Sequence, residues 1–175
     1  MIIIGIDPGS SQSGVCLIET GNHKEPNIMS ADKICNDELR RTLRSGWARH
    51  CEIAIEDFIS YQFGKSSDAT SQFIGMVKVT AEYEQIPLTV YTRRDYGQWF
   101  TAGGKLSDAT LRAALESIYG PSSKKGDPLY LLRGASDKRS AFAIAKYHEF
   151  QLSKVTSNGT DPARIPHAPQ HDHAR

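Results

Sequence analysis

Three carboxylates stand at the ends of segments that are predicted to form regular secondary structure. Asp7 ends the apolar run IIIGID, Glu56 ends IAIE, and Asp137 lies in the first turn of a predicted helix. Strand ends in an α/β sheet converge on one edge, where ligand crevices form. Acids at such an edge can hold Mg²⁺, which prefers oxygen ligands and keeps waters for the substrate. Two such ions would activate a water and stabilise the leaving oxygen of a phosphodiester.

Each acid also has a simpler structural explanation. Asp7 precedes a Pro-Gly pair and can organise a turn, while Glu56 can be a surface acid beside Asp57. Asp137 can stabilise the N-terminus of its helix through the helix dipole. The presence of all three at the ends of elements favours a common site.

The segment IGIDPGSSQSG also matches superficially the hairpin with which sugar kinases and actin-like ATPases hold a nucleotide phosphate. Those proteins need a second domain of comparable size and a further glycine-rich loop. A chain of 175 residues has room for neither, and it contains no GxxxxGK[ST] motif. The metal-site interpretation of the acids is therefore the stronger one.

Hydrophobic periodicity predicts the elements that position these acids. The first two strands form a hairpin, and strands then alternate with helices, which predicts an α/β sheet of mixed direction with helices on its faces. The polar segment 20–32 is predicted to be a loop, and 93–105 is a basic and aromatic segment. The predicted strands are 2–6, 14–19, 51–58 and 87–92, and the predicted helices are 36–48, 69–85, 107–119 and 135–150.

Composition predicts one globular domain over residues 1–150 and a polar, disordered tail over 151–175. The net charge of +1 gives no overall positive field that would indicate a nucleic-acid partner. Cys16, Cys35 and Cys51 show no CxxC spacing and predict free thiols in a reducing compartment. The sequence contains no apolar run of membrane-spanning length and no secretory signal, so a cytoplasmic protein is expected.

With its motifs in this order, the chain resembles the RuvC-type Holliday-junction resolvases, in particular their small phage-encoded relatives. The matching segments are GIDPGSSQSG, IAIEDF and SDKRSAFAIAKYH, and the resemblance runs from about residue 2 to 148. It implies the ribonuclease H-like fold, a mixed five-stranded sheet flanked by helices. It also implies an endonuclease that resolves four-way or other branched DNA by hydrolysis, with Mg²⁺ or, in its place, Mn²⁺.

By the same resemblance, Asp7, Glu56 and Asp137 match the first three catalytic, metal-binding acids of the family. A fourth acid usually follows the third by three residues, and here that position is Ser140. A serine hydroxyl can contact a metal-bound water but brings no charge, so weaker binding of at least one ion is expected. Three acids can suffice, Asp57 can be recruited, or the chain binds junctions with weakened or no cleavage. A serine substituted to trap a complex is a further alternative.

The resemblance also places DNA-binding residues around the acids. Tyr61 and Phe63 would approach the junction centre and stack on unpaired bases, although core packing is an equal alternative for either. Lys105 matches, in a loose alignment, a lysine near the scissile phosphate and is a candidate catalytic residue. Basic side chains would contact phosphates without sequence preference, although each basic cluster also fits a solvated face. The expected DNA-binding residues are Tyr61, Phe63, Arg93, Arg94, Lys105, Lys138 and Arg139.

A homodimer is the assembly that the resemblance implies. Each subunit would cut one of two opposed strands, so that two sites related by a two-fold axis match a junction of similar symmetry. The dimer helix would be the predicted helix 69–85, which can also face the core of its own subunit.

Overall fold

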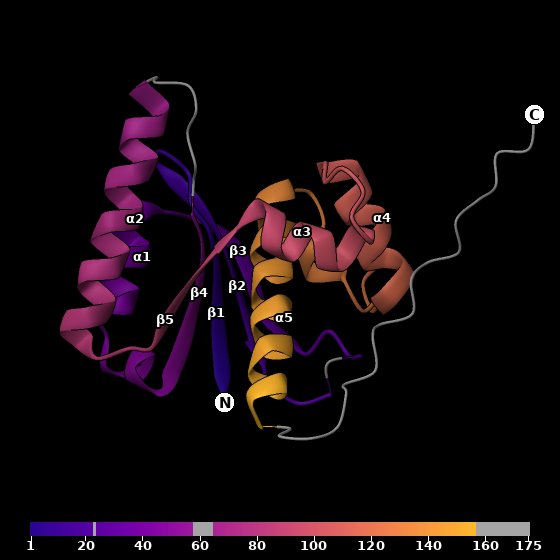
Figure 1. Cartoon of the computed structure of the whole chain (residues 1–175), viewed down its shortest axis with the longest axis horizontal. Coiled ribbons are helices and arrows are strands. Elements are labelled where there is room, and N and C mark those ends of the chain that lie inside the picture. Colours follow the sequence, from indigo (N-terminus) through magenta and orange to yellow (C-terminus); the bar gives the residue numbers. More distant parts are fainter. Residues whose placement is uncertain (23, 58–64, 157–175) are drawn as a thin grey trace, which may run out of the picture.

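The computed structural model shows a mixed five-stranded sheet with helices on both faces (Figure 1). It describes residues 1–22, 24–57 and 65–156. The central strand pairs antiparallel with the second and parallel with the fourth, which confirms the predicted hairpin and mixed sheet. In spatial order the strands are β3 (Ile28–Cys35), β2 (Gln12–Glu19), β1 (Ile2–Asp7), β4 (Cys51–Asp57) and β5 (Leu88–Thr92).

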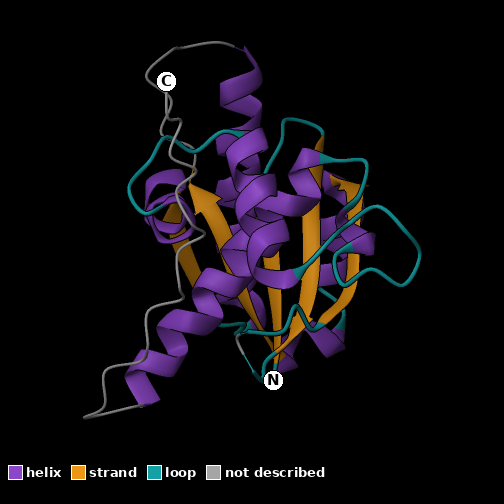
Figure 2. Cartoon of the chain, turned by 90° about the vertical axis from the view of Figure 1, so that its right-hand side faces the viewer, coloured by secondary structure: helices purple, strands orange, loops and turns teal. Residues whose placement is uncertain are grey.

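The helices form one layer on each side of the sheet (Figure 1). Two cover one face, and the C-terminal helix crosses the other, where two further helices pack on it. Figure 2, which views the molecule from this second side, shows these helices in front of the strands. The first layer contains α1 (Asn36–Leu43) and α2 (Lys65–Glu84), and the second contains α3 (Arg93–Thr101), α4 (Asp108–Tyr119) and α5 (Ser136–Thr156). Two short 3₁₀ helices, Gly46–His50 and Tyr130–Leu132, complete the described elements.

Each face of the sheet has its own hydrophobic core. Successive side chains of a strand point to opposite faces, so neighbours in sequence join different cores. Ile3 and Ala54 belong to the core under α5, whereas Ile4 and Ile53 belong to the core under α1 and α2. Strands buried on both faces have continuous apolar sequences, which is why β1 and β4 were predictable.

Two glycines allow α5 to lie directly on β1 and β2. A Cβ atom at Gly5 would lie 2.1 Å from the carbonyl oxygen of Ala141, and one at Gly14 would lie 2.3 Å from that of Asp137. Gly14 is also the register partner of Asp7 on β1. This close approach therefore places the first turn of α5 against the end of β1.

Replacing Gly14 with alanine is expected to lower the free energy of unfolding by about 2 to 3 kcal/mol, because α5 must move to admit the methyl group. Gly46→Ala is the matched control, since a Cβ atom there meets nothing within 4 Å. Urea denaturation followed by circular dichroism measures both variants. Equal stability of Gly14→Ala and the unchanged chain would show that α5 is not held this closely.

Two elements were missed by the sequence-based predictions. The segment predicted as a loop over 20–32 ends in β3, a polar edge strand in which Ala31 is the one buried residue. The segment 93–105 begins with α3, whose N-terminus is closed by a capping box between Thr92 and Asp95. Both elements lack an apolar run, because each covers the core with only a few side chains.

Three predicted helices have different bounds in the structure, among them α2, which begins at Lys65 and not at residue 69. The helix expected over 36–48 stops at Leu43, and a 3₁₀ turn follows it. The helix α5 continues past residue 150 to Thr156, since Leu152 still packs against the core. Residues 157–175 of the predicted tail lie outside the described residues.

The three cysteines are free thiols, as predicted. No helix in the described ranges has the length and apolar character that crossing a membrane would require.

Candidate active site

The fold brings Asp7, Glu56 and Asp137 to one edge of the sheet. Asp7 ends β1 and Glu56 lies near the end of β4, and these neighbouring strands are parallel, so their carboxyl ends share an edge. Asp137 reaches the same edge from the first turn of α5, above Gly14. Burial and the nearby carboxylates of Glu56 and Asp137 raise the pKa of Asp7 to about 7. The three acids therefore interact electrostatically.

Ser140 faces this cluster from α5, one turn after Asp137. It is 2% exposed, and the interaction of its hydroxyl with the Asp7 carboxylate partly opposes the rise in the pKa of Asp7. The serine thus occupies the place of the expected fourth acid and contributes a donor in place of a charge. Asp57, the alternative fourth acid, lies 3.6 Å from the ammonium group of Lys78 and is partly exposed.

Glu56 is held in a defined orientation by α3. The hydroxyl of Tyr96 donates a 2.7 Å hydrogen bond to Glu56 Oε2, and Tyr96 is completely buried. The guanidinium group of Arg93 lies 4.0 Å from the same oxygen and pairs with Asp108 at 3.1 Å. Burial raises the pKa of Glu56, and the bond from Tyr96 and the charge of Arg93 oppose that rise.

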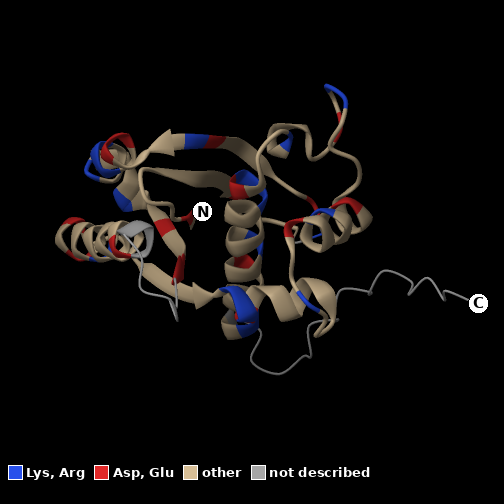
Figure 3. Ribbon diagram, turned by 90° about the horizontal axis from the view of Figure 1, so that it is seen from above, with Lys and Arg blue, Asp and Glu red and all other residues tan. Residues whose placement is uncertain are grey.

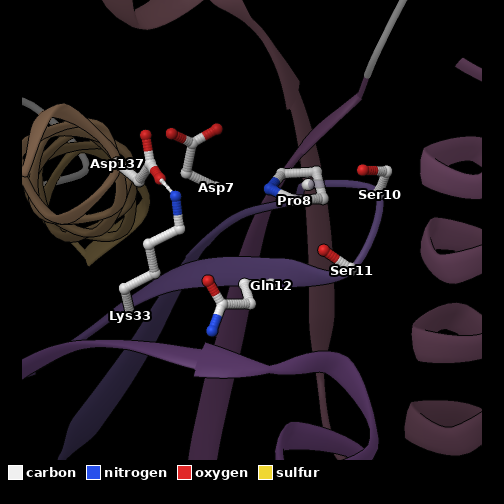
Figure 4. A pocket seen from close by; sticks show the side chains of 8 residues that line it. Asp7, Pro8, Ser10, Ser11, Gln12, Lys33 and Asp137 are labelled. Carbon is white, nitrogen blue, oxygen red and sulfur yellow. Dashed lines mark ion pairs between the residues drawn. The ribbon is translucent and has the colours of Figure 1, made fainter. Parts of the chain in front are cut away.

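A cavity of about 220 Å³ opens beside Asp7 and Asp137, at the turn between β1 and β2 (Figure 4). Lys33 lines its outer wall from β3, and its ammonium group lies 2.5 Å from Asp137 Oδ2. This ion pair lowers the pKa of Asp137. The cavity is lined by Asp7, Pro8, Gly9, Ser10, Ser11, Gln12, Lys33 and Asp137.

Tyr96 and Lys33 were not identified from the sequence. Tyr96 lies on the buried face of α3, and the Thr92-x-x-Asp95 capping pattern could have revealed that helix. Lys33 follows the segment assigned to a loop, and its partner Asp137 is distant in sequence. Only the pairing of β2 with β3 brings the two together.

The carboxylate oxygens at this edge of the sheet suit a hard divalent cation, although the side chains of Asp137 and Glu56 have other partners in this structure. Within the described ranges, no three His, Cys, Asp or Glu side chains already form a metal-binding group. Asp137 faces Lys33 and Glu56 faces Tyr96. Burial and the neighbouring acids raise the pKa of Asp7, and a bound cation would oppose this rise. The carboxylate oxygens of Asp7 and its neighbouring acids are suitable ligands for Mg²⁺ or Mn²⁺.

The expected DNA-binding residues have different surroundings. Arg93 lies at the site beside Glu56, and Lys105 is exposed in the loop between α3 and α4. Lys138 and Arg139 donate hydrogen bonds to backbone carbonyls of the 3₁₀ turn that precedes α5.

Arg94 is exposed on α3, and Tyr61 and Phe63 lie outside the described residues. Seen from above, Lys and Arg are spread over several elements together with Asp and Glu (Figure 3). None of these positions by itself identifies a DNA-binding surface.

Comparison with known proteins finds similar sequences among the RuvC proteins. No protein-family model matches the chain. The crossover junction endodeoxyribonuclease RuvC of Bifidobacterium adolescentis is 24% identical over 171 residues, which cover 91% of this chain and 84% of that protein. The RuvC of Hydrogenovibrio crunogenus is 31% identical over 101 residues, covering 51% of this chain and 58% of that protein.

Solved structures agree with these sequence similarities. Thermus thermophilus RuvC in complex with a Holliday junction substrate superposes with a TM-score of 0.68 at 19% identity, covering 89% of this chain and 97% of that one. The yeast mitochondrial Holliday junction resolvase superposes with a TM-score of 0.53 at 12% identity, covering 88% and 81%. Over most of its length the chain is similar in sequence to RuvC proteins, and it has the fold of the solved RuvC structures.

Proposed function

We propose that this protein is a metal-dependent endonuclease that resolves four-way or other branched DNA in recombination or repair. The observation that carries the proposal is the meeting of Asp7, Glu56 and Asp137 at one sheet edge. It is supported by similarity over 91% of the chain to a protein named as a crossover junction endodeoxyribonuclease. The superposable Thermus thermophilus protein was solved with a Holliday junction substrate.

Mg²⁺ is the proposed ion, with Mn²⁺ as a substitute, and Asp7, Glu56 and Asp137 are the residues that would hold it. When bound, the ion would activate the attacking water and stabilise the leaving oxygen of the phosphodiester. Ser140 would help to position the Asp7 carboxylate, with which its hydroxyl interacts. Arg93, which lies 4.0 Å from Glu56, would hold a DNA phosphate at the edge.

Contacts with the DNA backbone are proposed for exposed basic residues in and next to α3. Lys105 and Arg94 are exposed on the layer that contains Arg93 and can reach phosphates without a change in the fold. Such contacts bind any sequence and weaken steeply as the salt concentration rises. Lys105 remains the candidate for a contact with the scissile phosphate.

A homodimer is the proposed assembly, formed through α2. This helix exposes large apolar side chains, with Tyr83 77% and Val79 66% exposed. They border a groove of about 420 Å³ whose basic wall is formed by Arg40 of α1 and by Arg44, which directly follows that helix. A second copy of the chain would cover this apolar surface and supply a second site. Sedimentation equilibrium tests the assembly, and a monomer at all accessible concentrations would contradict it.

The proposed activity is tested with a synthetic four-way junction labelled on each strand. We expect cleavage of two opposed strands with Mg²⁺, none with EDTA, and none on a linear duplex of the same sequence. Glu56→Gln is the control for the site, because it should still bind the junction without cutting it. Absence of cleavage with Mg²⁺ and with Mn²⁺ at low salt would refute the proposal.

Replacing Tyr96 with phenylalanine is expected to weaken Mn²⁺ binding by about tenfold, because Glu56 loses the donor that orients its Oε2 atom. Isothermal titration of the metal-free protein measures this change. Tyr91→Phe is the matched control, since it also removes a hydroxyl with a partner, the 2.8 Å bond to His148. Equal Mn²⁺ affinities of the two variants would show that Tyr96 does not position the metal ligand.

A further inference from the structure

We propose that Lys33 is a positioning residue of the active site, whose ammonium group holds Asp137 until a divalent cation displaces it. Metal binding at Asp137 is then a competition with an internal lysine. The inference rests on the proposed function, because it assumes that the three acids hold a metal ion. The inference concerns how tightly the three acids hold the metal ion in the absence of DNA.

The register of the sheet supports this role for Lys33. Lys33 on β3 pairs with Gly14 on β2, and Gly14 pairs with Asp7 on β1. The three residues form one row across the strands, and the middle position has no side chain. Asp137 lies directly over that glycine, since a Cβ atom there would come within 2.8 Å of Asp137 Cβ. The glycine thus makes room for Asp137 between Lys33 and Asp7.

The ion pairs of the three acids show why the positive charge of Lys33 is important. Within the described part of the chain, the acids of the site have two cationic partners, Lys33 at Asp137 and Arg93 at Glu56. Arg93 is shared with Asp108, which lies closer to it. Lys33 is therefore the cation that neutralises the Asp137 side of the cluster.

Lys33 is also able to leave. Its side chain is 44% exposed at the wall of the cavity, and Asp137 is partly exposed as well, so separating them leaves no buried charge. An ion pair in such a position is weak. A divalent cation gains more from Asp137 and Asp7 together than one ammonium group does. Lys33, once displaced, remains at the cavity beside the turn Pro8–Gln12.

Mn²⁺ titration of the metal-free, full-length protein without DNA tests the competition. Lys33→Met is expected to bind Mn²⁺ about fivefold more tightly than the unchanged chain, as removal of a weak competing ion pair predicts. Lys24→Met, which removes an exposed lysine from another part of the surface, is the matched control and should bind like the unchanged chain. Lys33→Gln, which keeps a polar side chain on the edge strand, should reproduce the effect of Lys33→Met.

A second pair of variants tests whether the effect acts through Asp137. In an Asp137→Asn background, Lys33→Met should no longer change the Mn²⁺ affinity. Unchanged or weaker Mn²⁺ binding by both Lys33 variants would overturn the inference. Junction cleavage by the unchanged chain distinguishes this failure from a failure of the proposed function, because cleavage would persist when only the role of Lys33 is wrong.

Discussion

Asp7→Asn is expected to abolish junction cleavage and, at the same time, to stabilise the metal-free protein. Asparagine has nearly the same shape as aspartate but lacks the charge that would hold the metal ion. We expect the cleavage rate to fall by about 10³-fold, as when a preorganised electrostatic group is lost. Junction binding should persist, because the basic residues remain.

The gain in stability follows from the pKa of Asp7. Burial and the neighbouring acids raise this pKa from 3.8 to about 7 in the folded protein. Between these two values the unfolded chain has lost the proton that the folded chain keeps, so folding becomes less favourable as the pH rises. The penalty is absent below about pH 4 and complete above about pH 7, and it amounts to roughly 2 to 4 kcal/mol.

Urea denaturation in EDTA at pH 8 and at pH 4 measures this difference. Asp7→Asn should be more stable than the unchanged chain at pH 8 and nearly equal to it at pH 4. Asp37→Asn, at an exposed position in α1, is the control and should change little at either pH. Lower stability of Asp7→Asn at pH 8, or retained cleavage, would contradict this account of the site.

Glu149→Ala is expected to destabilise the protein by about 3 to 5 kcal/mol, because it leaves the charge of Lys146 buried without a partner. Lys146 is completely buried, pairs with Glu149 and donates a 2.8 Å hydrogen bond to the carbonyl oxygen of Glu25. Glu149 also accepts a 2.9 Å hydrogen bond from the backbone N–H of Gly21. These bonds join α5 to the connection between β2 and β3, away from the acids.

A double variant separates the charge from the packing. Lys146→Met combined with Glu149→Leu removes both charges and retains apolar volume, so it should lose less stability than Glu149→Ala alone. Chemical denaturation of the three proteins at pH 7 gives the comparison. If the double variant is the least stable of the three, the loss arises from packing and not from an unpaired charge.

The sequence predicts those parts of the fold whose signals are local. β1 and β4 have apolar runs because both of their faces are buried, and Leu39 and Leu43 have the spacing of an amphipathic helix. Asp7 and Glu56 could be placed at one edge because strand ends in such sheets converge. The elements β3 and α3 give weaker signals, since each has few buried residues.

Lys33 and Tyr96 could not be predicted from the sequence for a different reason. Each acts on an acid far away in the chain, Lys33 on Asp137 and Tyr96 on Glu56. Such pairs depend on strand register and on how α3 and α5 pack, which no short motif encodes. The acids of the proposed site were visible in the sequence, whereas their partners Lys33 and Tyr96 required the structure.

Gly5 and Gly14 allow α5 to pack closely on the sheet. This docking of α5 also determines when activity can arise during synthesis. The strands that carry Asp7 and Glu56 leave the ribosome early, and they present two of the three acids. The third acid arrives with α5, the last described helix of the chain. Chains are made from the N-terminus onward, so an incomplete chain lacks the third acid of the site. A growing chain of the proposed nuclease would therefore be unable to cut DNA until its final helix has docked.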